Sequence, residues 1–129
     1  MKKIETTAAP SSKGVYSQGV VTNSAQQLLF VSGQLPIDPT TDHLVTSNIA
    51  DQTKQVLDNI TAILNAAGSS WQQVVKVEIF LTDLNAHFSL VNEIYRTYIN
   101  PSLPPARQTI QVGALPRGAP IEISCIAIV

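Results

Sequence analysis

The chain has 129 residues, of which 44% are hydrophobic and only 13% are charged, and its formal net charge is −1. This length predicts one domain, residues 1–129, with enough apolar side chains for a packed core. The basic residues form no cluster, which argues against a dedicated nucleic-acid binder, and no apolar run approaches the ~20 residues of a membrane span.

The single cysteine, Cys125, excludes an intrachain disulfide and is typical of a reducing compartment, so we expect a cytoplasmic protein. The N-terminal stretch Met1-Lys2-Lys3-Ile4 lacks the apolar segment of a signal peptide. So few charges leave little polar surface to cover the apolar residues. We therefore expect a homo-oligomer, with a monomer that has a Ser/Thr/Asn/Gln-rich surface as the alternative.

The first third of the chain predicts a β-hairpin. An extended run at residues 16–22 is followed by a turn at 22–25 and by an apolar strand at 28–31. Residues 32–34 end that strand, and a proline-containing loop follows at 36–43.

Two amphipathic helices are predicted in the middle of the chain. The first runs from about Ile49 to Ala67, with Asn48 as its cap and Gly68 at its left-handed exit. Apolar residues at helical spacing mark the second over residues 88–99, where Asn100-Pro101 stops it. A short helical turn is expected between them, at Ser70 to Gln73.

Three further strands are predicted, at residues 75–81, 107–112 and 121–129. The order β-β-α-β-α-β-β implies crossover connections and a mixed sheet, hence an α+β fold. Because each helix has one apolar stripe, both helices are expected on a single sheet face. We expect the other face to be covered by the same sheet of another subunit, closed into a ring.

The last two strands contain the candidate chemistry, in Pro105-Ala106-Arg107 and Ile121-Glu122-Ile123. Arginine grips a small carboxylate with two parallel hydrogen bonds, and a carboxylate nearby can position or activate a water. The pair therefore indicates hydrolysis of a small anionic metabolite. The alternatives are an edge-strand arginine and an outward-facing strand glutamate.

The distance between these two groups leaves a question open. If the last two strands pair as a hairpin around the loop at residues 113–120, Arg107 and Glu122 are separated by more than ~10 Å. Either the two strands are not neighbours, or an adjacent subunit helps to complete the site.

No metal site is expected from this sequence. His43 and His87 stand in separate segments without ligand spacing, and Cys125 shares the apolar face of Ile121 and Ile123, which predicts a buried thiol.

Five short segments occur in a characteristic order: Tyr16-Ser17-Gln18-Gly19, Val31-Ser32-Gly33-Gln34, Asp83-Leu84-Asn85, Pro105-Ala106-Arg107 and Ile121-Glu122-Ile123. In this order and at these intervals they resemble the RidA/YjgF family of reactive-intermediate (enamine/imine) deaminases, over essentially the whole chain. The resemblance implies a chorismate-mutase-like α+β fold and a homotrimer with active sites in the inter-subunit clefts. It also implies hydrolysis of 2-iminobutanoate and 2-iminopropanoate to 2-keto acids and ammonia. No metal or organic cofactor is implied, and the functional link is to PLP-dependent dehydratases.

The resemblance assigns roles to individual residues. Arg107 would bind the substrate carboxylate, and Glu122 would position or activate the attacking water. The pocket would be lined by Tyr16, Ser32, Gly33 and Asn92, with Tyr16 reaching it across the subunit boundary. Pattern alone leaves an ordinary alternative for each of them. Tyr16 is equally an aromatic residue in a strand, and Ser32 and Gly33 are equally the end of a strand. Asn92 is equally a solvent-facing helix residue.

Two positions depart from the family pattern. Thr109 stands where many relatives have cysteine, a position thought to act mainly through its backbone; threonine leaves hydrolysis possible and excludes thiol chemistry. Gln108 is larger and more polar than the small residue usual there.

Two other functions stay open: a non-catalytic keto-acid-binding or protein-interaction module, and RNA cleavage or translation inhibition, which are also attributed to family members.

Overall fold

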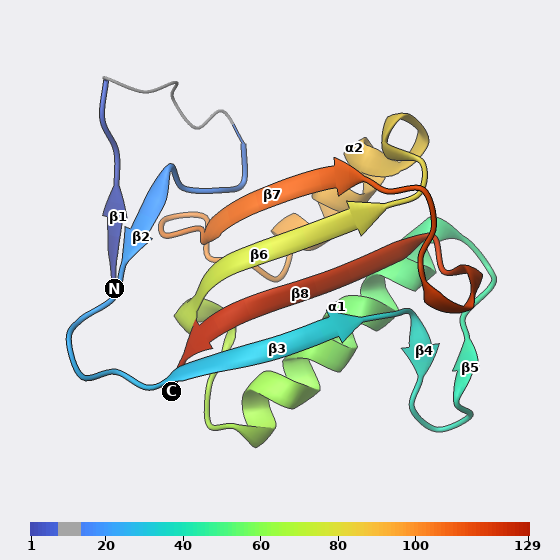
Figure 1. The fold of residues 1–129 in the computed structure, drawn as a ribbon, viewed down its shortest axis with the longest axis horizontal. Coiled ribbons are helices and arrows are strands. Elements are labelled where there is room, and N and C mark those ends of the chain that lie inside the picture. The colour runs from blue at the N-terminus through green and yellow to red at the C-terminus, as the bar shows by residue number, and fades with distance from the viewer. Residues whose placement is uncertain (8–13) are drawn as a thin grey trace.

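The computed structural model describes residues 1–7 and 14–129, and a four-stranded mixed sheet forms its centre (Figure 1). The strand order is β3-β8-β6-β7. These strands are β3 (Leu28–Gln34), β6 (Val74–Leu81), β7 (Ala106–Gln111) and β8 (Ile121–Ile128). β6 and β7 are parallel, whereas β8 is antiparallel to both of its neighbours. The last strand of the chain therefore lies inside the sheet.

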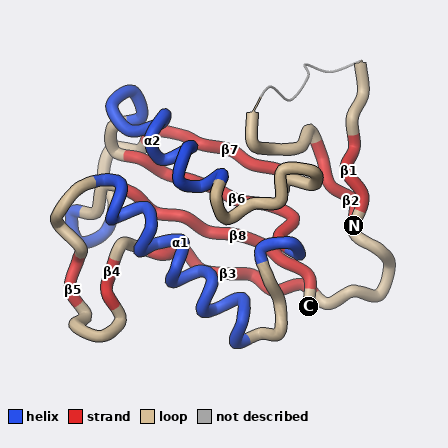
Figure 2. The backbone as a smooth tube through the Cα atoms, turned by 180° about the vertical axis from the view of Figure 1, so that it is seen from behind, coloured by secondary structure: helices blue, strands red, loops and turns tan. Residues whose placement is uncertain are grey.

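Helices α1 (Ile49–Ala66) and α2 (Leu84–Arg96) cover one face of this sheet (Figure 2). Each begins at a side-chain cap, because Asn48 accepts a hydrogen bond from the backbone N–H of Asp51 and Asp83 accepts one from Ala86. α2 makes the crossover that two adjacent parallel strands require. The single covered face and the α+β class confirm the prediction.

Short elements complete the described structure. They are β1 (Lys2–Ile4), β2 (Gly19–Val21), β4 (Ile37–Asp38), β5 (His43–Leu44) and the 3₁₀ turns Trp71–Gln73 and Pro116–Gly118. β1 pairs with β2, and β4 pairs with β5, as two separate antiparallel ribbons.

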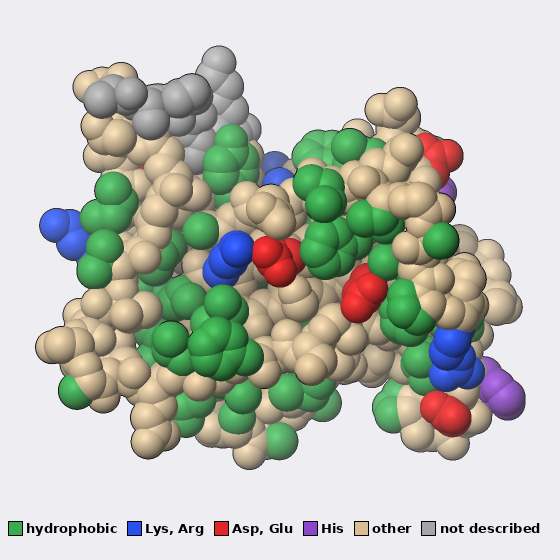
Figure 3. Space-filling view, in the orientation of Figure 1, with side chains coloured by type: hydrophobic (Ala, Val, Ile, Leu, Met, Phe, Trp, Pro, Cys, Tyr) green, Lys and Arg blue, Asp and Glu red, His purple; other side chains and the backbone are tan. Residues whose placement is uncertain are grey.

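Strict alternation along β6 and β8 separates the core from the other sheet face. The side chains of Val77, Ile79, Leu81, Ile121 and Ile123 are buried against the helices, at 0 or 1% exposure. We call the sheet face opposite the two helices the open face. On it, Phe30 is 70% exposed and Ile110 is 41% exposed. Figure 3 shows apolar side chains gathered over this face, with few charges among them.

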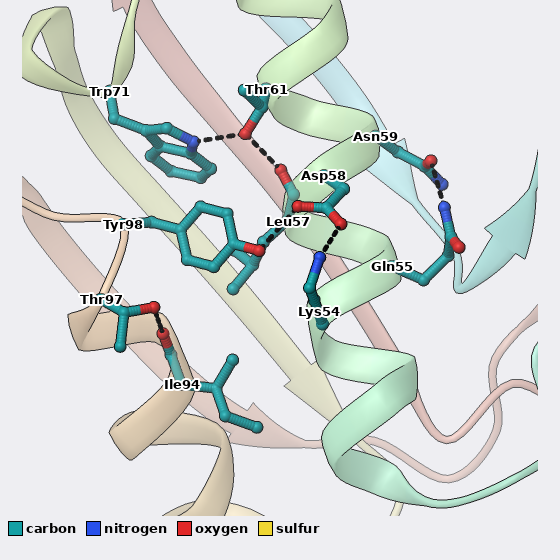
Figure 4. A network of polar contacts seen from close by, with 10 residues as sticks. All are labelled: Lys54, Gln55, Leu57, Asp58, Asn59, Thr61, Trp71, Ile94, Thr97 and Tyr98. Carbon is teal, nitrogen blue, oxygen red and sulfur yellow. Dashed lines mark hydrogen bonds and ion pairs between the residues drawn. The ribbon is translucent and has the colours of Figure 1, made fainter.

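Polar contacts join the interior of α1 to the segment that follows α2 (Figure 4). Tyr98, just after α2, donates its hydroxyl to Asp58 of α1 at 2.7 Å, and Asp58 also pairs with Lys54. Trp71 donates its indole N–H to Thr61 of α1 at 2.7 Å and meets the Tyr98 ring edge-on at 5.8 Å. These contacts fix the spacing of α1 and α2 over the sheet.

The predicted N-terminal hairpin is wrong. Within residues 16–22 only Gly19–Val21 forms a strand, and it pairs with β1 rather than with β3. β3 instead pairs with β8, ninety-odd residues later in the chain, and it continues through Gln34 with a bulge at residues 32–33. The expected loop at 36–43 contains the small β4–β5 ribbon.

Candidate active site

Arg107 lies on β7 and points toward α2. Its Nη1 donates a hydrogen bond to Asn92 Oδ1 of α2 at 2.6 Å. The guanidinium carbon lies 5.1 Å from the ring centroid of Tyr95 and 5.8 Å from that of Tyr16. One amide oxygen and two aromatic faces therefore hold the guanidinium in place. Asn92, which the resemblance places in the lining of the pocket, is thus a contact of Arg107.

The Arg107 cation has no counter-ion within residues 1–7 and 14–129. The four ion pairs in that part of the chain join Lys3–Glu5, Lys54–Asp58, Lys76–Glu78 and Asp42–Arg117. Burial lowers the pKa of Arg107, but an arginine in a protein keeps its proton. The half-buried guanidinium donates only to a neutral amide oxygen, so a bound anion would stabilise its charge.

Tyr16 is positioned by the segment that leads into β2. The next residue, Ser17, donates its backbone N–H to Pro105 O at 2.9 Å and its hydroxyl to Pro104 O, and it forms a parallel bridge with Ala106. This segment therefore extends the sheet beside the start of β7. Tyr16 meets Arg107 of its own chain. Its reach into the pocket across a subunit boundary stays a prediction.

Thr109 lies two residues after Arg107 on the same side of β7. Its hydroxyl is buried and has no hydrogen-bond partner in the described structure. The residue lines a cavity of about 330 Å³ between β7 and α2, together with Leu84, Asn85, Phe88 and Ser89. None of these four helix residues was predicted as a site residue, although Leu84 and Asn85 belong to one of the five family-like segments. Asn85, Ser89 and Asn92 share one side of the helix, which is the signal that could have found them.

Glu122 and Gly33 form a second group, on the open face. Glu122 alternates with the buried Ile121 and Ile123, which confirms its expected outward direction. A Cβ built on Gly33 would lie 1.8 Å from Glu122 Oε1, so the glutamate occupies the space that a side chain at position 33 would need. Ser32, also exposed, precedes Gly33 in the bulge of β3.

One chain does not bring the two groups together. β6 lies between β7 and β8, with Arg107 beside Val77 and Glu122 beside Phe80. Three residues along β6 correspond to about 10 Å, and two inter-strand spacings add nearly the same distance across the sheet. The two side chains also point to opposite faces. The candidate site residues therefore form two separate groups. We call them the arginine half (Tyr16, Asn92, Arg107, Thr109) and the glutamate half (Ser32, Gly33, Glu122).

Gln108 contributes to a polar cluster on the open face. Its amide donates to Glu78 Oε1 at 3.2 Å, and the same carboxylate accepts a bond from Ser124 and pairs with Lys76. Gln108 thus links β7 to β6, which accounts for a polar residue at this position.

The remaining titratable candidates stay outside both halves. Cys125 is 3% exposed, and burial raises the pKa of its thiol to about 12, which confirms the predicted buried thiol. Burial also raises the pKa of the Tyr95 hydroxyl. Across the described ranges, no group of three or more His, Cys, Asp or Glu side chains could hold a metal ion. No described helix is long and apolar enough to cross a membrane.

Comparison with known proteins identifies the family. The model of the family described as Endoribonuclease L-PSP matches residues 6–129. A 2-iminobutanoate/2-iminopropanoate deaminase of Mus musculus is 45% identical over 98% of this chain and 90% of its own length. The solved structure of a Rid-family protein from Yersinia pestis is 47% identical, with a TM-score of 0.76 over 99% of this chain and 98% of that one. TdcF from E. coli, solved with bound serine, is 36% identical, with a TM-score of 0.73 over 100% of this chain and 99% of that one. The chain therefore belongs to the Endoribonuclease L-PSP family, the family of the RidA and YjgF proteins.

Proposed function

We propose that this chain is a hydrolytic deaminase that converts small 2-imino acids, such as 2-iminobutanoate and 2-iminopropanoate, to 2-keto acids and ammonia. The observation that carries the proposal is the half-buried Arg107, which has no counter-ion in the described chain and is held by Asn92 and two aromatic rings. It is suited to bind the carboxylate that all these substrates share. The mammalian relative named for this activity supports the same reading.

The reaction requires only that the protein position the substrate and a water and assist proton transfer. Water adds to the carbon of the C=N bond, the nitrogen is protonated, and the tetrahedral intermediate loses ammonia to leave a C=O bond. Arg107 fixes the substrate by its carboxylate, and Glu122 accepts a proton from the attacking water. Positioning and general acid–base catalysis supply the acceleration, the latter contributing about 10²–10⁴-fold.

We infer that Glu122 comes from a second copy of the chain, in a homotrimer whose sites lie between subunits. The two halves of the site lie on opposite sheet faces, so no small substrate meets both within one chain. The open face carries exposed apolar side chains, Phe30 among them, which a second copy would bury.

The direct test measures imine loss in the presence of the protein. A threonine dehydratase generates 2-iminobutanoate, and the rate is compared with the unaided hydrolysis in buffer. Arg107→Ala should lower kcat/KM by about 10² or more, because it removes two charge-assisted hydrogen bonds. The kcat/KM of Arg107→Lys should lie between that of the natural chain and that of Arg107→Ala, because lysine keeps the charge without the planar guanidinium group. Lys54→Ala, on the outer side of α1, is the control; full activity of Arg107→Ala would refute the proposal.

Two other functions predict different results. A keto-acid-binding module would bind 2-oxobutanoate and never accelerate imine loss. The enzyme instead predicts that Glu122→Gln keeps keto-acid binding and loses turnover.

RNA cleavage is the activity after which the Endoribonuclease L-PSP family is named. Here the eight basic residues are outnumbered by nine acidic ones, and Lys3, Lys54, Lys76 and Arg117 are already in ion pairs. A steep salt dependence of RNA affinity in highly purified protein would favour this activity.

A further inference from the structure

A cavity lies between α2 and β7, two residues along β7 from Arg107. Asn92 contacts Arg107, and one helical turn earlier Ser89 lines the same cavity as Thr109. Helix and strand therefore run side by side from the carboxylate position to the cavity. At about 330 Å³ it is within the ~300–1,000 Å³ range of ligand pockets, larger than a methyl or ethyl group needs.

This cavity combines apolar walls with polar groups that have no protein partner. Leu84 and Phe88 supply the apolar walls. The side chains of Asn85 and Ser89 make no hydrogen bond within the described residues, and neither does the hydroxyl of Thr109. A pocket of this kind fits a short ligand group that has both apolar and hydrogen-bonding parts.

Thr109 is the member of this set whose state demands a ligand. Its hydroxyl is turned away from solvent and lacks a partner, which is unfavourable for a buried polar group. Because Thr109 also lines the cavity, a ligand acceptor or donor that reaches its hydroxyl from there completes the missing hydrogen bond.

We infer that the cavity receives the side chain of the substrate, and that Thr109 selects 2-imino acids whose side chain carries a hydroxyl or a carboxamide. The inference rests on the proposed function, because it takes Arg107 as the anchor of the substrate carboxylate. Two residues along a strand separate anchor and selector by about 7 Å, so a substrate held at Arg107 extends its side chain toward Thr109.

Two imines of nearly equal shape test this inference. An amino-acid oxidase generates the imine of asparagine, which carries a carboxamide, and the imine of leucine, which carries a branched alkyl group instead. The readout is the ratio of kcat/KM for the asparagine imine to that for the leucine imine. Thr109→Val keeps the shape and removes the hydroxyl, so this ratio should fall about fivefold to tenfold, the value of one hydrogen bond.

Two further variants separate selection from a structural role. Thr109→Ser keeps the hydroxyl and should keep the high ratio. Thr97→Val removes a hydroxyl that bonds to Ile94 O, outside the cavity, and should leave the ratio unchanged. Thr109→Val loses no hydrogen bond to residues 1–7 or 14–129, so its melting temperature should equal or exceed that of the natural chain.

The outcomes distinguish this inference from the proposed function. A ratio that does not change in Thr109→Val, or that falls equally in Thr97→Val, overturns the role of Thr109. If the natural chain accelerates loss of 2-iminobutanoate but discriminates against the carboxamide imine, the inference fails while the proposed function stands. If it accelerates the loss of none of the three imines, the proposed function itself fails.

Discussion

Gly33 is required for the position of Glu122, because any Cβ there would collide with the glutamate oxygen. The backbone of Gly33 has no positive φ, so alanine is conformationally tolerated. The colliding atom is the end of a flexible side chain, which can move away. We therefore expect Gly33→Ala to change the free energy of unfolding by no more than about 1 kcal/mol, while imine hydrolysis falls toward the level of Glu122→Gln. Chemical denaturation and the imine assay measure the two effects.

Gly113 provides the matched control for this substitution. A Cβ at Gly113 meets nothing within 4 Å, and its φ is also not positive, so Gly113→Ala should keep full activity. In a Glu122→Ala background, Gly33→Ala should cause no additional loss, since the colliding carboxylate is gone. Full activity of Gly33→Ala in the natural background would contradict the role of Glu122.

The residues of the candidate site were predictable individually, but their division into halves was not. The family pattern pointed to Arg107, Glu122 and Asn92, and the alternation of β8 correctly placed Glu122 away from the core. Their separation depends on β6 lying between β7 and β8, and no local pattern near either residue encodes that strand order. The contact of Tyr95 with Arg107 was not predicted, because the helical spacing of Tyr95 is that of a buried core residue.

Among the elements, the long periodic ones were the predictable ones. α1, β6 and β8 repeat their apolar residues over eight or more positions, and the structure has them close to the predicted limits. α2 begins at Leu84, earlier than expected, because Asp83 caps it, and it ends at Arg96 rather than at Ile99. β1, β4 and β5 have only two or three residues each, too few for a period. The wrong N-terminal hairpin came from assuming that strands adjacent in sequence pair.

The contribution of the Tyr98 hydroxyl to the free energy of unfolding can be measured. Tyr98→Phe removes the hydroxyl that bonds to Asp58 and keeps the ring against Trp71. We expect the free energy of unfolding to fall by about 1 kcal/mol, the usual net value of such a hydrogen bond. Urea denaturation followed by tryptophan fluorescence reports the change directly.

Lys54→Ala is the comparison for Tyr98→Phe, because it removes the other contact of Asp58. An exposed pair of this kind on a helix is worth only about 0.3–0.5 kcal/mol. If Lys54→Ala destabilises the protein more than Tyr98→Phe, the hydroxyl is not what joins the helices.

At the level of the assembled protein, the two half-sites predict complementation between inactive chains. Arg107→Ala and Glu122→Gln should each be inactive alone. When the two are co-expressed and assemble at random, about one quarter of the inter-subunit sites combine an intact Arg107 with an intact Glu122. The mixture should therefore regain a corresponding fraction of the natural activity in the imine assay.

A second mixture controls for simple stabilisation by a partner. Arg107→Ala mixed with a chain carrying both substitutions contains no intact Arg107 and should stay inactive. If the first mixture also stays inactive although mass spectrometry shows mixed oligomers, each site is contained in one chain.

The central place of β8 has a consequence for how the protein is made. Its residues 121–128 separate β3 from β6, so neither of those strands has its antiparallel neighbour until the ribosome has finished this segment. The nascent polypeptide must carry the unpaired edge of β3 through most of its synthesis and that of β6 through the last part, a condition that exposes it to aggregation. The four-stranded sheet therefore cannot close before residues 121–128 have been synthesised.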